Sequence, residues 1–89
     1  MKKILEFYGE NCLGCRMLKP IMHEYIKENP DIVLEEISID TEEGMNTARK
    51  YNVRSLPTVV FIKDDTVTGW FVGTCSLGDI NTKAMEAFA

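Results

Sequence analysis

The sequence predicts a small α/β domain in which a four-stranded mixed sheet is flanked by three helices. Three observations lead to this prediction: short apolar runs typical of strands, helical spacing of apolar residues between them, and the order β-α-β-α-β-β-α. A hydrophobic content of 45% with 27% charged residues excludes a disordered chain. The length of 89 residues leaves room for one core, so we expect a single domain over residues 1–89.

The first half of the chain is typical of a strand, a helix and a second strand. Residues 2–8 combine β-formers and aromatics in a short run. A helix over residues 12–28 is expected next, because apolar residues recur there at spacings of three and four: Met17, Leu18, Ile21, Met22, Tyr25 and Ile26. Pro20 lies inside this helix and is expected to kink its axis. Residues 31–39 then alternate in polarity as a strand does.

The second half is typical of a helix, a hairpin and a closing helix. Residues 40–43 supply a polar cap and two acids, which favours a short helix through about Tyr51. Two β-rich runs, 58–62 and 66–72, are separated by a turn and predict a hairpin. Ser76 begins a capping box, and the last helix is expected to have an apolar side formed by Ile80, Ala84, Met85 and Phe88.

Charge and hydropathy argue against several classes of partner. The net charge is −4, and no cluster of Lys and Arg is present to neutralise successive phosphates of a nucleic acid. No apolar run approaches the roughly 20 residues of a membrane span. The apolar stretch after Met1-Lys2-Lys3 is too short for a signal peptide. We therefore expect a cytoplasmic monomer with no nucleic-acid or membrane partner.

The chemistry of the sequence is concentrated in Cys12-Leu13-Gly14-Cys15, at the expected start of the first helix. Disulfide exchange needs a thiolate that attacks and a second thiol that resolves the mixed disulfide. Cys12 comes first and faces the unpaired N–H groups of the helix start, which favour a thiolate. Cys12 is therefore the candidate nucleophile and the deeper Cys15 the candidate resolving thiol, with Leu13 and Gly14 forming the bend between them.

Metal binding and regulation are the other roles that the cysteines could have. A zinc site needs four ligands, and only Cys75 and His23 remain. His23 lies about two helical turns from Cys15, which is too far for the two to share an ion. We therefore expect no metal site and no cofactor. His23 itself is expected to be a helix residue that is solvated or partly covered. Cys75 is expected to be a small near-surface residue, with a regulatory thiol as the alternative. The methionines at positions 17, 22 and 85 are expected to fill the core.

With these landmarks the chain resembles the thioredoxin family, and the resemblance covers nearly all of it. The matching features are the dithiol motif at a helix start, Pro20 inside that helix, Leu56-Pro57-Thr58 before the third strand, and Val72-Gly73 before the last helix. The resemblance implies a thioredoxin fold with a cis peptide bond at Pro57. It implies further that Pro57 faces Cys12 and that Leu13, Gly14, Leu56, Pro57 and Gly73 line the substrate groove.

The chain departs from the family pattern around the dithiol. No counterpart of the family's leading strand and helix is expected, so the architecture is similar to the minimal, glutaredoxin-sized version. Asn11 replaces the tryptophan that usually precedes the first cysteine, and Leu13-Gly14 replaces Gly-Pro. The resemblance places Glu6 at the family's buried acid, a candidate proton acceptor for Cys15, and Glu36 where a lysine usually partners that acid. Two carboxylates near Cys15 oppose its ionisation.

We therefore expect a thiol–disulfide oxidoreductase that reduces protein disulfides through Cys12 and Cys15. Re-reduction by a flavoprotein of the thioredoxin-reductase type, or by a thiol pool, is expected. One alternative is a glutaredoxin-like, glutathione-coupled reductase, although residues 73–76 lack the Gly-Gly and following acid of a glutathione clamp. A second alternative is a non-catalytic thioredoxin-fold protein that binds a partner in its groove, and a third is a metal-handling protein.

Overall fold

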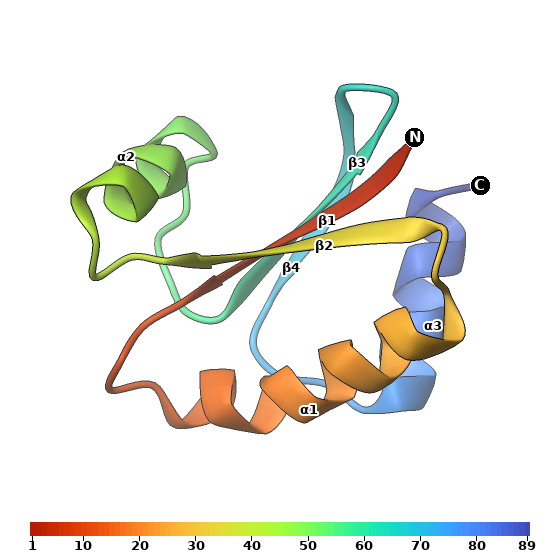
Figure 1. The fold of residues 1–89 in the computed structure, drawn as a ribbon, viewed down its shortest axis with the longest axis horizontal. Helices are drawn as coiled ribbons and strands as arrows, with labels where there is room; N and C mark the ends of the chain where they lie inside the picture. Colours follow the sequence, from red (N-terminus) through yellow and green to blue (C-terminus); the bar gives the residue numbers. More distant parts are fainter.

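The computed structural model describes all 89 residues, and its secondary structure follows the predicted order. The elements are β1 (Lys2–Tyr8), α1 (Leu13–Glu28), β2 (Ile32–Ser38), α2 (Glu42–Lys50), β3 (Thr58–Lys63), β4 (Thr66–Val72) and α3 (Leu77–Ala87) (Figure 1). The predicted α/β class, with four strands and three helices, is confirmed. None of these helices has the length and hydropathy needed to span a bilayer.

The four strands form one mixed sheet in the order β2-β1-β3-β4. β1 pairs with β2 in parallel, from Lys2 opposite Ile32 to Tyr8 opposite Ser38, and pairs with β3 in antiparallel orientation. β3 and β4 form the predicted hairpin. Because β1 and β2 are parallel, their carboxyl ends meet at one edge of the sheet, where α1 begins.

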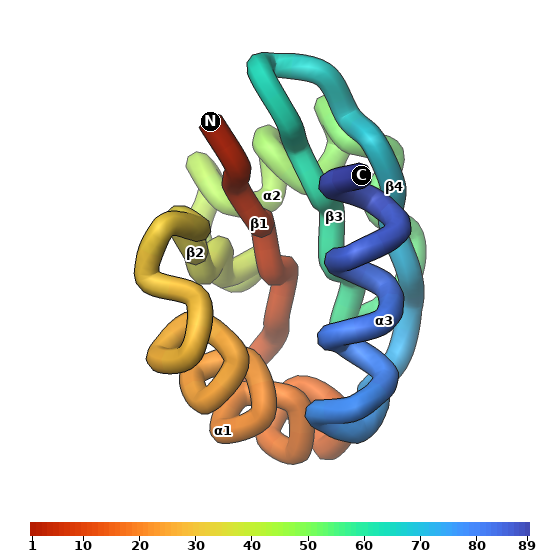
Figure 2. The backbone as a smooth tube through the Cα atoms, turned by 90° about the vertical axis from the view of Figure 1, so that its right-hand side faces the viewer, coloured from red at the N-terminus to blue at the C-terminus, as the bar shows by residue number.

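The helices cover the two faces of the sheet unequally. Figures 1 and 2 show α1 and α3 together on one face and α2 alone on the other. The core under α1 and α3 contains Ile4, Leu18, Met22, Tyr25, Ile32, Val59, Phe61, Ile80, Ala84 and Phe88. The smaller core under α2 contains Leu5, Phe7, Ala48, Val60 and Ile62. Because side chains alternate along a strand, Glu6 lies with Ile4 on the face that α1 and α3 cover.

Local side-chain chemistry explains where the helices begin. The Thr41 hydroxyl caps α2 by accepting the Gly44 N–H at 2.9 Å, and the Ser76 hydroxyl caps α3 by accepting the Asp79 N–H at 3.1 Å. Both are residue types favoured at this position because their oxygen satisfies an otherwise unpaired N–H group. α1 runs without interruption past Pro20 to Glu28.

The prediction that three methionines fill the core is wrong for two of them. Met22 is fully buried, whereas Met17 is 53% exposed and Met85 is 75% exposed. Each of the exposed residues follows or precedes a buried neighbour, Leu18 in α1 and Ala84 in α3, by one position. One position on a helix corresponds to about 100°, so these side chains face away from the sheet.

Candidate functional site

The two cysteines of the motif form a disulfide at the start of α1. Cys12 is the N-cap residue, and its Sγ accepts the backbone N–H of Cys15 at 3.1 Å. The two Cα atoms are 5.2 Å apart. Cys15 is 5% exposed, whereas Cys12 is only half-buried. The sulfur that a substrate can reach is therefore the one that lies in the positive field of the helix N-terminus.

The loop between β1 and α1 is tied to the end of the neighbouring strand. The Glu10 N–H donates to Asp40 Oδ2 at 2.8 Å, and the Ile39 N–H donates to the Tyr8 carbonyl at 2.9 Å. Arg16 Nη2 donates to the Glu10 carbonyl at 3.4 Å. These bonds fix the approach to the dithiol at the sheet edge where the two parallel strands end.

Pro57, which is distant from the cysteines in the sequence, lies against the turn that joins them. The Leu56–Pro57 peptide bond is cis, and Pro57 is fully buried. A Cβ on Gly14 would come within 3.2 Å of Pro57 Cδ, so the backbone of the turn and the proline ring are in close contact. A larger residue at position 14 would push the two apart.

Gly73 completes this side of the site. Its N–H donates to the Pro57 carbonyl at 2.8 Å, and its φ of +96° is a conformation that residues with a side chain rarely adopt. The backbone of Leu56, in contrast, makes no backbone hydrogen bond within the chain. The structure thus brings Gly14, Pro57 and Gly73 together and leaves the polar backbone groups of Leu56 free for an extended chain.

Two exposed apolar side chains lie in the first turns of α1, next to the disulfide in the sequence. Leu13 is 71% exposed, and Met17 follows it by four residues, on the same side of α1. The sequence interpretation missed Met17 as a surface residue of the site, although its i+4 spacing from Leu13 was a usable signal.

Glu6 is buried beneath the dithiol. It is 1% exposed, and its Oε1 has no hydrogen-bond partner. Glu6 and Cys15 line the same small cleft of about 220 Å³. Burial, and then the negative charge of Glu36, raises the pKa of Glu6 from 4.5 to about 7, while His23 and Lys19 act in the opposite direction. The carboxyl group can therefore exchange a proton near neutral pH.

Glu36 lies next to Glu6 in the parallel register and is bound by His23. His23 Nε2 and Glu36 Oε1 are 2.9 Å apart, and the His23 side chain is 49% exposed. The sequence interpretation treated His23 as a solvated or partly covered residue and did not find this pair. The available signal was the spacing of Cys15, Lys19 and His23, which places them along one line of α1.

The third cysteine lies apart from the disulfide chemistry. Cys75 is a free thiol, half-buried against the core under α1 and α3. Burial, and then the charge of Asp79, raises the pKa of this thiol. The chain contains no group of three or more His, Cys, Asp or Glu side chains arranged to hold a metal ion.

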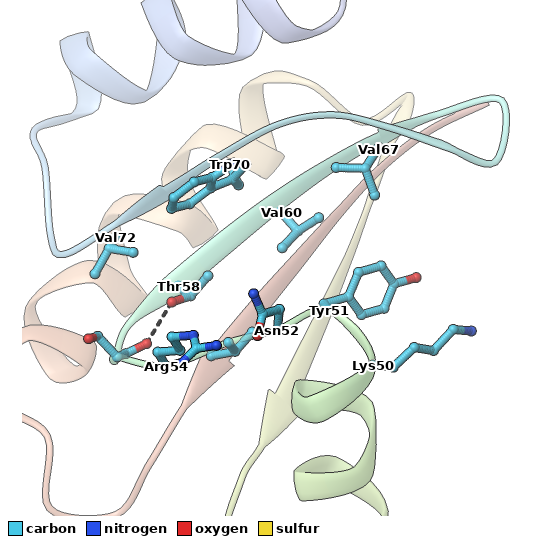
Figure 3. Close-up of a pocket in the computed structure, with 11 residues that line it drawn as sticks. Lys50, Tyr51, Asn52, Arg54, Thr58, Val60, Val67, Trp70 and Val72 are labelled. Atoms are coloured by element: carbon cyan, nitrogen blue, oxygen red, sulfur yellow. Dashed lines mark hydrogen bonds between the residues drawn. The ribbon is translucent and has the colours of Figure 1, made fainter.

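A wide groove of about 680 Å³ lies on the other face of the sheet (Figure 3). The loop after α2 forms one wall, where Arg54 and Tyr51 lie, and the exposed face of β3 and β4 forms the other, where Trp70 projects. Trp70 is 68% exposed, while its neighbour Phe71 packs on Phe61 on the opposite face. Neither cysteine of the disulfide lines this groove.

Comparison with known proteins gives one consistent result. A family model described as Thioredoxin matches residues 1–86. An H-type thioredoxin of Oryza sativa subsp. indica is 37% identical over 70 residues, which cover 79% of this chain and 56% of that protein. Thioredoxin-T of Drosophila melanogaster is 36% identical over 87 residues, covering 97% of this chain and 53% of that protein. The chain therefore spans about half of the length of these curated relatives.

The three-dimensional comparison covers more of the matched protein. The solved structure of thioredoxin from Fasciola hepatica matches this fold with a TM-score of 0.86 at 27% identity. The match covers 97% of this chain and 80% of that chain. The four-stranded mixed sheet with its three helices is therefore the arrangement found in a solved thioredoxin.

Proposed function

The chain belongs to the thioredoxin family, and from that membership and the geometry of the disulfide we propose that it is a thiol–disulfide oxidoreductase that reduces protein disulfides. The observation that carries the proposal is the pairing of an accessible sulfur, Cys12, with a buried one, Cys15, at the N-terminus of α1. Exchange chemistry needs this asymmetry, because one sulfur must meet the substrate and the other must wait until the first has reacted.

The reaction proceeds through two exchanges. The Cys12 thiolate attacks one sulfur of the substrate disulfide, and the other substrate sulfur leaves with the electron pair of the broken bond. Cys15 then loses its proton and attacks Cys12 Sγ in the mixed disulfide, which releases the second substrate thiolate. The substrate gains two electrons, and the protein ends in the Cys12–Cys15 disulfide form that the structure describes.

The surface around Cys12 supports binding of an extended polypeptide. The free backbone groups of Leu56 can pair with a substrate strand, and Leu13 and Met17 offer apolar contact beside the sulfur. Pro57 and Gly73, which are joined by a backbone hydrogen bond, form a rigid wall of this surface. The backbone bonds give affinity for many sequences, so we expect broad rather than narrow substrate choice.

Glu6 is proposed as the proton acceptor for Cys15 in the second exchange. The two side chains line one cleft, and the raised pKa of about 7 makes the carboxyl a base of suitable strength at neutral pH. Once Cys15 has reacted, Glu6 passes its proton to water through the cleft.

Insulin reduction tests the proposal. With dithiothreitol or a thioredoxin reductase as the electron source, the wild-type protein should accelerate insulin reduction, and Cys12→Ser should abolish the acceleration. Cys15→Ser should trap the mixed disulfide, which is visible as a covalent adduct on a non-reducing gel. Cys75→Ser is the matched control and should retain activity. Full activity of Cys12→Ser would rule the proposal out.

The electron donor is a separate part of the proposal. We propose a flavoprotein reductase of the thioredoxin-reductase type, acting in a reducing compartment, the cytoplasm. Turnover with NADPH and such a reductase, compared with turnover on glutathione and glutathione reductase, distinguishes this donor from a glutaredoxin-like coupling. A non-catalytic partner-binding protein would lack a dithiol–disulfide equilibrium between about −300 and −180 mV, the range of known exchange proteins.

A further inference from the structure

Glu6 has to be ionised at the moment when Cys15 gives up its proton, and its surroundings oppose this. The carboxyl is 1% exposed, and one of its oxygens has no partner. In a buried site the charged form is disfavoured unless neighbouring charges compensate. The groups that face Glu6 therefore decide whether it can act as the base.

Charged and titratable neighbours come from three parts of the chain. β2 supplies Glu36, the register partner of Glu6, and α1 supplies His23 and the three cleft residues Cys15, Arg16 and Lys19. The end of β1 and the loop after it supply Tyr8 and Glu10, while the β3 neighbour of Glu6 is the uncharged Val59. Glu36 is the unfavourable member, because a second carboxylate beside Glu6 opposes its ionisation.

His23 is the side chain that counters Glu36 directly. Its Nε2 lies 2.9 Å from Glu36 Oε1, and both side chains are partly exposed, at 49% and 32%. Lys19 also lies near Glu6 but forms no ion pair with any carboxylate.

We propose that His23 is a positioning residue for the exchange reaction: by binding Glu36 it offsets that carboxylate, so that Glu6 is ionised when Cys15 must lose its proton. This inference rests on the proposed function and adds to it a residue that touches neither the substrate nor the reacting sulfurs. The step it assists is the transfer of the Cys15 Sγ–H proton to Glu6. The Cys15 thiolate then attacks Cys12 Sγ, and the bond between Cys12 and the substrate sulfur breaks.

The direct test is the titration midpoint of the Glu6 carboxyl carbon, measured by NMR in the oxidised protein. His23→Gln keeps a hydrogen-bonding side chain but removes the cation, and should raise the midpoint by about half a pH unit or more. His23→Lys restores a cation and should return the midpoint to the wild-type value or below. Glu36→Gln should lower the midpoint, and adding His23→Gln to it should then have a smaller effect.

Two further variants separate the pair from a general effect of charge. Lys27→Gln removes a cation further along α1 and should leave the Glu6 midpoint in place. Lys19→Gln should raise the midpoint less than His23→Gln, because Lys19 does not bind Glu36. A midpoint unchanged by His23→Gln, or moved more by Lys19→Gln, would overturn the inference. Because the His23 side chain is half exposed, the His23 variants should fold as the wild type does, and their titrations can be compared directly.

The resolving step gives the second readout. The decay of the mixed disulfide with a substrate should be about threefold slower for His23→Gln at pH 6.5 and unchanged at pH 9, where Glu6 is ionised in both proteins. An equal loss of rate at both pH values would contradict the proposed positioning role. If insulin reduction proves independent of Cys12, the proposed function fails. If the activity depends on Cys12 but His23→Gln leaves the pH dependence of mixed-disulfide decay unchanged, only the role of His23 is removed.

Discussion

Gly14 lies against the ring of Pro57, two residues that are more than forty positions apart in the sequence. A Cβ at position 14 would approach Pro57 Cδ to 3.2 Å. Gly14 is the second residue of α1, and Gly78 is the second residue of α3. These two glycines occupy the same helical position, so they form a matched pair for mutation.

The first prediction compares alanine at these two glycines. Gly78→Ala should increase the free energy of unfolding by about 0.5–1 kcal/mol, because alanine favours a helix and its Cβ would lie 3.8 Å from Ser76 Oγ, an ordinary contact. Gly14→Ala should show no such gain and should slow insulin reduction several-fold, because the dithiol turn must move away from Pro57. Urea denaturation and initial rates measure both effects. An equal gain in stability at both positions would show that Gly14 is not in close contact with Pro57.

The second prediction concerns the stability cost of Glu6. Because its pKa rises from 4.5 to about 7 on folding, the folded protein keeps a proton over this range that the unfolded chain has released. Stability therefore falls as pH rises from 4.5 to 7 and stays low above 7. Glu6→Gln should be more stable than the wild type by about 3 kcal/mol at pH 8, with no difference at pH 4.

Glu35→Gln is the control for this measurement. Glu35 directly precedes Glu36 on β2 and forms an exposed ion pair with Lys3 at 3.0 Å. Its loss should change the free energy of unfolding by less than about 0.5 kcal/mol, as is usual for exposed pairs. A Glu6→Gln variant whose stability follows the same pH profile as the wild type would contradict the raised pKa.

The third prediction concerns Met17, which lies exposed beside the disulfide. Met17→Ser should leave stability within about 0.5 kcal/mol, because little apolar surface is buried there. It should lower kcat/KM for insulin about two- to fivefold while leaving the rate with a small disulfide such as oxidised glutathione unchanged. Met85→Ser, at an exposed methionine on α3, should change neither rate. Equal effects of the two variants on insulin reduction would remove Met17 from the substrate surface.

The fourth prediction concerns Cys75. Burial and the charge of Asp79 raise the pKa of its thiol, so less thiolate is present at neutral pH. In the oxidised protein, where Cys75 is the free thiol, iodoacetamide at pH 7.5 should react about tenfold more slowly than with free cysteine. Asp79→Asn should speed this reaction. After reduction of the disulfide, mass spectrometry should find Cys12 modified first, and modification of Cys75 at the same rate would contradict the prediction.

Sequence periodicity was sufficient for the element order, because strands and helices bury residues at different intervals. The spacing of apolar residues on α1 and α3 did not distinguish core from surface at Met17 and Met85, since adjacent helical positions differ by about 100° and the sheet covers only part of the circumference. The dithiol itself was evident from Cys12 and Cys15.

The parts of the site that the sequence did not predict depend on contacts between elements. The His23–Glu36 pair joins α1 to β2, and finding it requires both the rotation of the helix and the strand register that puts Glu36 beside Glu6. The groove beside Trp70 follows from how far α2 extends across its face of the sheet. Neither quantity is encoded in the spacing of residues within one element.

The bond from the Cys15 N–H to Cys12 Sγ makes the helix cap and the reacting atom the same sulfur. Each change in the charge or bonding of Cys12 therefore acts on the amide proton of Cys15. In a two-dimensional NMR spectrum the Cys15 amide peak should move further than any other in α1 between the oxidised and reduced states. The backbone thus provides a reporter of the redox state in a chain that has Asn11, and no indole, beside its first cysteine.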